Sequence, residues 1–285
     1  MKSFKDITMS LMGGSSIAAK EELTAPTVTA RVSRWQWLFL AALLAAITLT
    51  EWIFAYKNVA YGIGLSLFLA MGIYLVISVI RLSPPIIDCA ESLALIPLYI
   101  LFTSSLPWFF INQQYLLPAV YSTILALCLW HIYQKKLSFS ALGFKKNKWL
   151  KYVLIGIAIG IPMGVGEYFV IYPAPVFPTF EVKYLLRDLF YMVCFVGLGE
   201  ELLFRGLLQR DLTNALGWKW GVVLASLMFA VMHLTWRSIP ELFFVFLAGM
   251  ILGYLYYKTK SLVAPIVMHG IGNVILVAIM PYLMS

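Results

Sequence analysis

The sequence predicts an all-α protein that crosses a membrane about nine times. Three observations support this fold class: 62% of the 285 residues are hydrophobic, only 12% are charged, and the apolar residues gather in runs long enough to span a bilayer. A soluble domain of this size carries far more charge. The formal net charge of +8 does not indicate nucleic-acid binding, because the basic residues lie between the apolar runs.

A helix that crosses the bilayer needs about 20 consecutive, mostly apolar residues. By this criterion we predict nine segments, at residues 35–55, 59–80, 86–111, 115–133, 149–172, 183–208, 218–236, 239–257 and 262–283. All nine tryptophans lie near segment ends, where their amphipathic rings favour the headgroup zone.

The first segment follows a polar N-terminal tail at residues 1–34, which we expect in the cytoplasm. It begins near Trp35, too far into the chain for a typical cleavable signal peptide, so we expect it to remain as a transmembrane helix. Charged residues and Pro107 blur the ends of the third segment. A basic loop at 134–148 separates the fourth and fifth segments, and a proline-rich stretch at 172–178 follows the fifth.

Glycine spacing predicts close helix packing in two segments. Gly156, Gly160 and Gly164 recur every four residues in the fifth segment, and Gly249 and Gly253 repeat this spacing in the eighth. Small residues at this spacing let helix backbones approach closely in lipid. A structural role therefore explains these glycines.

The basic residues predict the orientation of the chain. With the N-terminus in the cytoplasm, all but four of the 21 lysines and arginines fall on the cytoplasmic side, Arg205 included; the exceptions are Lys57, Lys183, Arg187 and Arg237. Cytoplasmic loops carry an excess of Lys and Arg. We therefore expect a cytoplasmic N-terminus and a C-terminus on the opposite side. Separately, we expect a multi-pass protein of the plasma membrane of a prokaryote.

Three short polar clusters interrupt the last segments, which otherwise suit a lipid environment. The clusters are Glu200 and Glu201 with Arg205, His233 alone, and His269 with Asn273. An ionisable group at the bilayer centre costs about 2.5–3.5 kcal/mol on insertion scales, so it normally faces a protein interior or a water-filled cavity. Several such groups on neighbouring segments indicate a site.

Helical spacing separates the two glutamates. Glu201 and Arg205 share a helix face, with the acid preceding the base, which is the better orientation for an ion pair. Glu200 points about 100° away, so its carboxylate stays free for chemistry. A structural ion pair for the glutamate cluster, and hydrogen-bonded core side chains for the histidines, remain open at this stage.

The clusters together suggest hydrolysis. A carboxylate, two imidazoles and an amide on three segments supply a base, a proton shuttle and donors for an oxyanion. A water held between Glu200 and His233 would then attack a peptide carbonyl.

The three clusters also match the motifs of a known family. Residues 200–205 fit EExxxR, residues 229–233 fit FxxxH, and residues 269–273 fit HxxxN. In order and separation they resemble the CAAX prenyl protease and bacteriocin-processing (CPBP) family, also called Abi, of intramembrane glutamic peptidases. The resemblance covers roughly residues 185–283.

The resemblance implies an intramembrane endopeptidase that acts on a membrane-associated protein or peptide in the lipid bilayer. By similarity, Glu200 and His233 would activate the water, while His269 and Asn273 would stabilise the oxyanion. The residues that would support the site are Glu201, Arg205 and Phe229.

On this basis the chain divides into the N-terminal tail, a region of five helices at 35–182, and a CAAX-protease-like catalytic core at 183–285. Eukaryotic relatives remove the tripeptide that follows a prenylated cysteine. Bacterial relatives are linked to peptide maturation, secretion of signals and self-immunity to bacteriocins.

Two other functions stay open. Two histidines and a carboxylate also resemble a catalytic zinc site, although the sequence lacks HExxH and we expect no metal. A non-enzymatic transporter or bacteriocin-immunity protein would also place charged residues in the membrane. Against a transporter, the sequence has no inverted repeat and no matched pair of broken helices.

Overall fold

The computed structural model describes residues 32–144 and 147–284, and the elements in these ranges are α-, π- and 3₁₀-helices without a strand. Eight helices in this part of the chain are long and apolar enough to cross a membrane: Arg34–Lys57, Val59–Val79, Pro84–Ser104, Gln113–Gln134, Trp149–Ile171, Trp218–Trp236, Ile239–Thr259 and Val263–Leu283. The prediction of an all-α, multi-pass membrane protein is confirmed. The predicted tail at 1–34 falls outside the described residues apart from its C-terminal end, and the N-in orientation stays a prediction.

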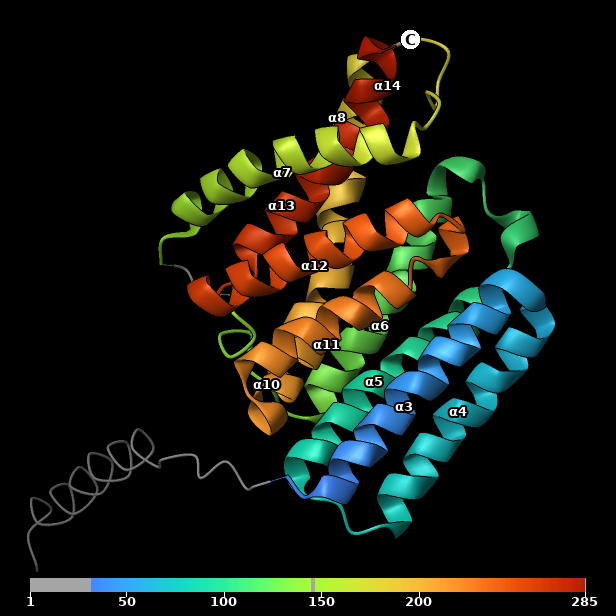
Figure 1. Ribbon diagram of the computed structural model, residues 1–285. Helices are drawn as coiled ribbons and strands as arrows, with labels where there is room; N and C mark the ends of the chain where they lie inside the picture. The colour runs from blue at the N-terminus through green and yellow to red at the C-terminus, as the bar shows by residue number, and fades with distance from the viewer. Residues whose placement is uncertain (1–31, 145–146, 285) are drawn as a thin grey trace, which may run out of the picture. The chain divides into compact units, whose positions relative to one another are not determined.

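The eight spans contain α3 (Arg34–Trp52) with the π-helix η2 (Ile53–Lys57), α4 (Val59–Val79), α5 (Pro84–Ser104), α6 (Leu116–Gln134), α7 (Trp149–Ile171), α11 (Trp218–Val231), α12 (Ile239–Thr259) and α13 (Val263–Val274). The last span continues through the π-helix η8 (Ile275–Ile279) into α14 (Met280–Leu283). Figure 1 shows α3, α4 and α5 side by side, and α7 lying along α13.

The sixth predicted segment, 183–208, is the difference between nine predicted spans and eight observed ones. It belongs to a longer helical run composed of α8 (Val182–Tyr191), η5 (Met192–Gly197), α9 (Leu198–Glu201), η6 (Leu202–Gln209) and α10 (Arg210–Leu216). Glu200, Glu201 and Arg205 fall close together in this run, and all three are buried within the protein. Ionisable side chains inside a bilayer normally face the protein interior. The run therefore carries too many charges to count as a lipid-facing span. Arg205, which the orientation argument counts on the cytoplasmic side, is buried in this run.

The third predicted segment, 86–111, ends earlier than expected. α5 stops at Ser104, and a 3₁₀ turn at Trp108–Phe110 follows Pro107. Proline disfavours the α conformation in the residue that precedes it. The helix therefore ends before it reaches Pro107.

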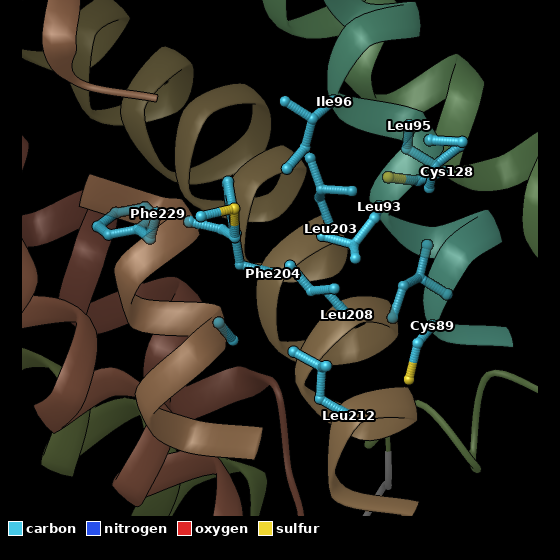
Figure 2. Close-up of a cluster of buried hydrophobic side chains, with 14 of the residues drawn as sticks. Cys89, Leu93, Leu95, Ile96, Cys128, Leu203, Phe204, Leu208, Leu212 and Phe229 are labelled. Carbon is cyan, nitrogen blue, oxygen red and sulfur yellow. The ribbon is translucent and has the colours of Figure 1, made fainter. Parts of the chain in front are cut away.

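A large hydrophobic cluster joins α5 to the helical run that carries the glutamates. Figure 2 shows Leu93 of α5 and Leu203 of η6 directed into this cluster. Phe204 lies next to Phe229 of α11, with ring centroids 5.1 Å apart in an edge-to-face arrangement. The packing fixes η6, and with it the preceding turn α9, between α5 and α11.

The glycines of α7 bring its backbone directly against α13. A Cβ added at Gly164 would lie 2.2 Å from the carbonyl oxygen of Gly272, and one added at Gly160 would lie 2.6 Å from that of Met268. Real Cβ atoms do not approach this closely, so only glycine fits here. The predicted packing role of this glycine series is confirmed, and it fixes α7 beside the helix that carries His269.

Candidate active site

The four residues predicted to be catalytic line one cavity of about 680 Å³. Glu200 comes from α9, His233 from the turn after α11, and His269 and Asn273 from α13. Phe229 lines the cavity as well. Side chains from three separate parts of the chain therefore meet at one space large enough for a peptide segment.

Glu201 and Arg205 lie behind this cavity and support it. The Oε1 atom of Glu201 accepts hydrogen bonds from Nη1 of Arg205 at 2.7 Å and from Nδ1 of His269 at 2.8 Å. The predicted ion pair between Glu201 and Arg205 is confirmed, with side chains only 0% and 1% exposed. Because a carboxylate only accepts, Nδ1 of His269 must carry a hydrogen, and this fixes the ring orientation.

The fixed ring of His269 directs its other nitrogen toward the free glutamate. Nε2 of His269 lies 3.8 Å from Oε2 of Glu200. This Glu200 oxygen is buried and has no hydrogen-bond partner among the described residues. The separation is longer than a direct hydrogen bond and suits a group that bridges the two atoms.

The glycine pair of α12 receives the polar side chains of η6. Nη2 of Arg205 donates to the carbonyl of Gly249 at 3.2 Å, and Nε2 of Gln209 donates to the carbonyl of Gly253 at 2.8 Å. Arg205 and Gln209 are four residues apart, and so are Gly249 and Gly253. Two successive turns of η6 therefore face two successive turns of α12. The glycines give these buried side chains access to backbone carbonyls.

His233 follows the C-terminal end of α11 and is held by its own helix. Its Nδ1 lies 2.8 Å from the carbonyl oxygen of Phe229, which can only accept, so Nδ1 carries the hydrogen. The Nε2 atom of a neutral His233 is then an acceptor. The turn is anchored farther along, where Arg237, in the left-handed conformation, donates from Nε to the carbonyl of Ala55 in η2 at 2.8 Å.

Phe229 connects the cationic and imidazole groups of the site. Its ring centroid lies 4.4 Å from Cζ of Arg205, 4.9 Å from the His233 ring and 5.7 Å from the His269 ring. An aromatic face attracts a guanidinium placed over it, so this contact helps to keep Arg205 behind the cavity.

Three further lining residues were not predicted. Tyr121 of α6 lies close enough to interact with Glu200, and Glu167 of α7 lies close enough to interact with Glu241 of α12. A lone tyrosine in an apolar segment carries no distinguishing signal. Glu167 did carry one, because it is an ionisable residue inside the fifth predicted segment. Glu241 was hidden by its place in a Ser-x-x-Glu pattern with Ser238, which is typical of a helix start.

The alternative of a catalytic zinc ion requires several ligand side chains close together in the described residues. Within them, no group of three or more His, Cys, Asp or Glu side chains is spaced to hold a metal ion. In both histidines Nδ1 is already engaged, by Glu201 for His269 and by a backbone carbonyl for His233.

The chain is a polytopic helical membrane protein with a cavity lined by a buried carboxylate and two histidines. Residues 183–275 match the family model described as Type II CAAX prenyl endopeptidase Rce1-like. For this part of the chain the predicted family, the CAAX proteases, is confirmed, and members of that family act on peptide bonds. Neither a curated protein nor a solved structure matches the chain significantly. Every motif residue lies inside the matched range, whereas Tyr121 and Glu167 lie outside it.

Proposed function

We propose that this CAAX-type protease hydrolyses a peptide bond of a membrane-associated protein or peptide, with Glu200 as the general base and without a metal. The observation that supports this most strongly is the Glu200 carboxylate, which faces the cavity with one unpartnered oxygen 3.8 Å from His269. A base needs such a free acceptor within reach of the proton that it removes. We further propose an N-in protein of a prokaryotic plasma membrane.

In the proposed reaction Glu200 and His233 hold the attacking water. The Nε2 atom of a neutral His233 accepts one hydrogen of the water, and Glu200 removes the other. The water oxygen then bonds to the carbonyl carbon, and the carbonyl oxygen becomes an oxyanion. When the C–N bond breaks, the leaving nitrogen takes the proton from Glu200, which yields an acid and an amine.

His269 and Asn273 would donate to the oxyanion. Nδ1 of His269 already carries a hydrogen, so donation from Nε2 uses the imidazolium form. Glu200 and Glu201, on either side of this ring, would balance its charge. The Asn273 amide lies one turn farther along the same helix and supplies a neutral donor.

The test compares membranes from cells that carry the native chain, Glu200→Gln or Glu181→Gln. Glu181 is the matched control, because it undergoes the same chemical change at an exposed position outside the cavity. We expect new peptide termini in the native and Glu181→Gln samples, and a loss of about 100-fold or more in their abundance with Glu200→Gln. Identical termini in all three samples, or full turnover by purified Glu200→Gln, would refute the assignment.

A further inference from the structure

A second pair of carboxyl groups lies in the same cavity, away from the motif residues. Glu167 projects from α7 and Glu241 from α12, and both line the cavity that holds Glu200. Their carboxyl groups lie close enough to interact with each other. Two carboxylates can only accept, so a hydrogen bond between them requires one proton to be held there.

Glu241 is placed for a ligand more than for helix capping. Its residue is 1% exposed, and its Oε2 atom has no hydrogen-bond partner among the described residues. In a capping box this side chain would turn back to the backbone N–H of Ser238. Only the other half of the box is present, where Oγ of Ser238 accepts from the backbone N–H of Glu241 at 3.3 Å.

The charges of the cavity wall are unbalanced. Among the described residues that line the cavity, Arg187 is the sole lysine or arginine, and its Nε donates to Asp188 at 2.9 Å. Arg187 also lies over Phe177, 4.7 Å from the ring centroid. With Arg187 paired with Asp188, and His269 placed between Glu200 and Glu201, Glu167 and Glu241 have no lysine or arginine partner among the described residues that line the cavity.

We infer that Glu167 and Glu241 form a subsite for a positively charged group of the substrate, a lysine or arginine side chain or a free amine near the scissile bond. A cation between the two carboxylates replaces the shared proton, which passes to solvent. Its hydrogens then satisfy the unpartnered oxygen of Glu241. This inference names the substrate of the proposed protease site and therefore rests on the proposed function.

The structural alternative is a hydrogen bond that only joins α7 to α12. Such bonds between membrane helices stabilise packing modestly. That role predicts changes in stability and no change in the preference between charged and neutral substrates. The ratio of the two rates therefore separates the alternatives.

The experiment uses purified full-length protein in lipid nanodiscs and a nonapeptide library in which one position is Lys, Arg, Met or Glu. We expect the native chain to cleave the Lys and Arg peptides with a kcat/KM about tenfold or more above that of the Met peptide, at one position. Glu241→Gln and Glu167→Gln should each reduce this Lys/Met ratio toward one. Glu181→Gln should keep the native ratio.

A binding measurement distinguishes failure of the proposed subsite from failure of the proposed protease function. Fluorescence anisotropy with the Lys and Met peptides is measured on Glu200→Gln, which is expected to bind without turnover. Equal affinities there, together with equal rates for Lys and Met peptides on the native chain, would overturn the subsite while leaving the protease intact. A preference in binding without cleavage by the native chain would instead overturn the proposed function. If Glu241→Gln does not fold, Glu167→Gln provides the same ratio.

Discussion

Replacing Glu201 by glutamine removes the charge that balances Arg205 and keeps the size of the side chain. Arg205 is 1% exposed, and its remaining contacts are the Gly249 carbonyl at 3.2 Å and the Phe229 ring at 4.4 Å. Removal of one partner from a buried ion pair costs about 3–5 kcal/mol, because the other charge stays desolvated. We therefore expect Glu201→Gln to lower the free energy of unfolding by about that amount.

Arg205→Met completes a double-mutant cycle. It should also destabilise strongly as a single change, because it leaves the Glu201 carboxylate buried. The double variant should be far more stable than the sum of the two losses predicts, since it leaves neither charge buried without its partner. One oxygen of Glu201 has no partner in the described part of the chain, so the native pair only partly offsets its desolvation.

The assay is denaturant unfolding in bicelles, followed by the fluorescence of the nine tryptophans. Glu181→Gln, at an exposed ion pair with Lys183, should leave the unfolding midpoint unchanged. Turnover gives a second readout: the double variant should recover stability and remain slow, because glutamine at position 201 no longer carries the negative charge that balances a His269 imidazolium. Additive losses in the cycle, or a midpoint for Glu201→Gln equal to that of Glu181→Gln, would contradict this account.

Three further predictions concern other parts of the structure. Gly164→Ala should destabilise the protein by about 1–3 kcal/mol in the same unfolding assay, because its Cβ would lie 2.2 Å from the Gly272 carbonyl, whereas Gly72→Ala, with nothing within 4 Å, should not. Arg237→Ala should lower kcat about tenfold to a hundredfold by releasing the turn that follows His233, with partial recovery in Arg237→Lys; a native kcat would show that the anchor is dispensable. Treatment with a strong zinc chelator should leave turnover unchanged, and loss of activity restored by stoichiometric zinc would instead support the metal-dependent alternative.

The position of the site was predictable because polar residues in a membrane segment are costly. That cost makes each polar cluster conspicuous against an apolar background, and helical spacing then places Glu201 with Arg205 and separates Glu200 from them. The glycine series of α7 was predictable for a related reason, since small residues at intervals of four have few other uses in lipid. These signals are local, and each can be recognised within one segment.

The features that escaped prediction depend on several segments at once. The π-helices on either side of α9 have no sequence signature, although such turns recur at functional sites. The ion pair of Arg205 with Glu201 was predictable within one segment, but the hydrogen bond of Arg205 to the Gly249 carbonyl joins residues far apart in sequence. Glu241 lies in a local pattern typical of a helix start, whereas its interaction with Glu167 joins residues far apart in sequence.

The helices before the matched range complete the site. The motif residues all lie within residues 183–275, yet Tyr121 and Glu167 line the same cavity, and Ala55 anchors the turn that follows His233. Lipid tails are as apolar as leucine, so helices in a bilayer associate through packing and hydrogen bonds rather than through the hydrophobic effect. The glycine contact of α7 with α13 and the cluster between α5 and η6 supply that packing. The hydrogen bonds that orient His269 and His233 lie within the matched segment, but the geometry of the candidate site also depends on the helices packed around that segment.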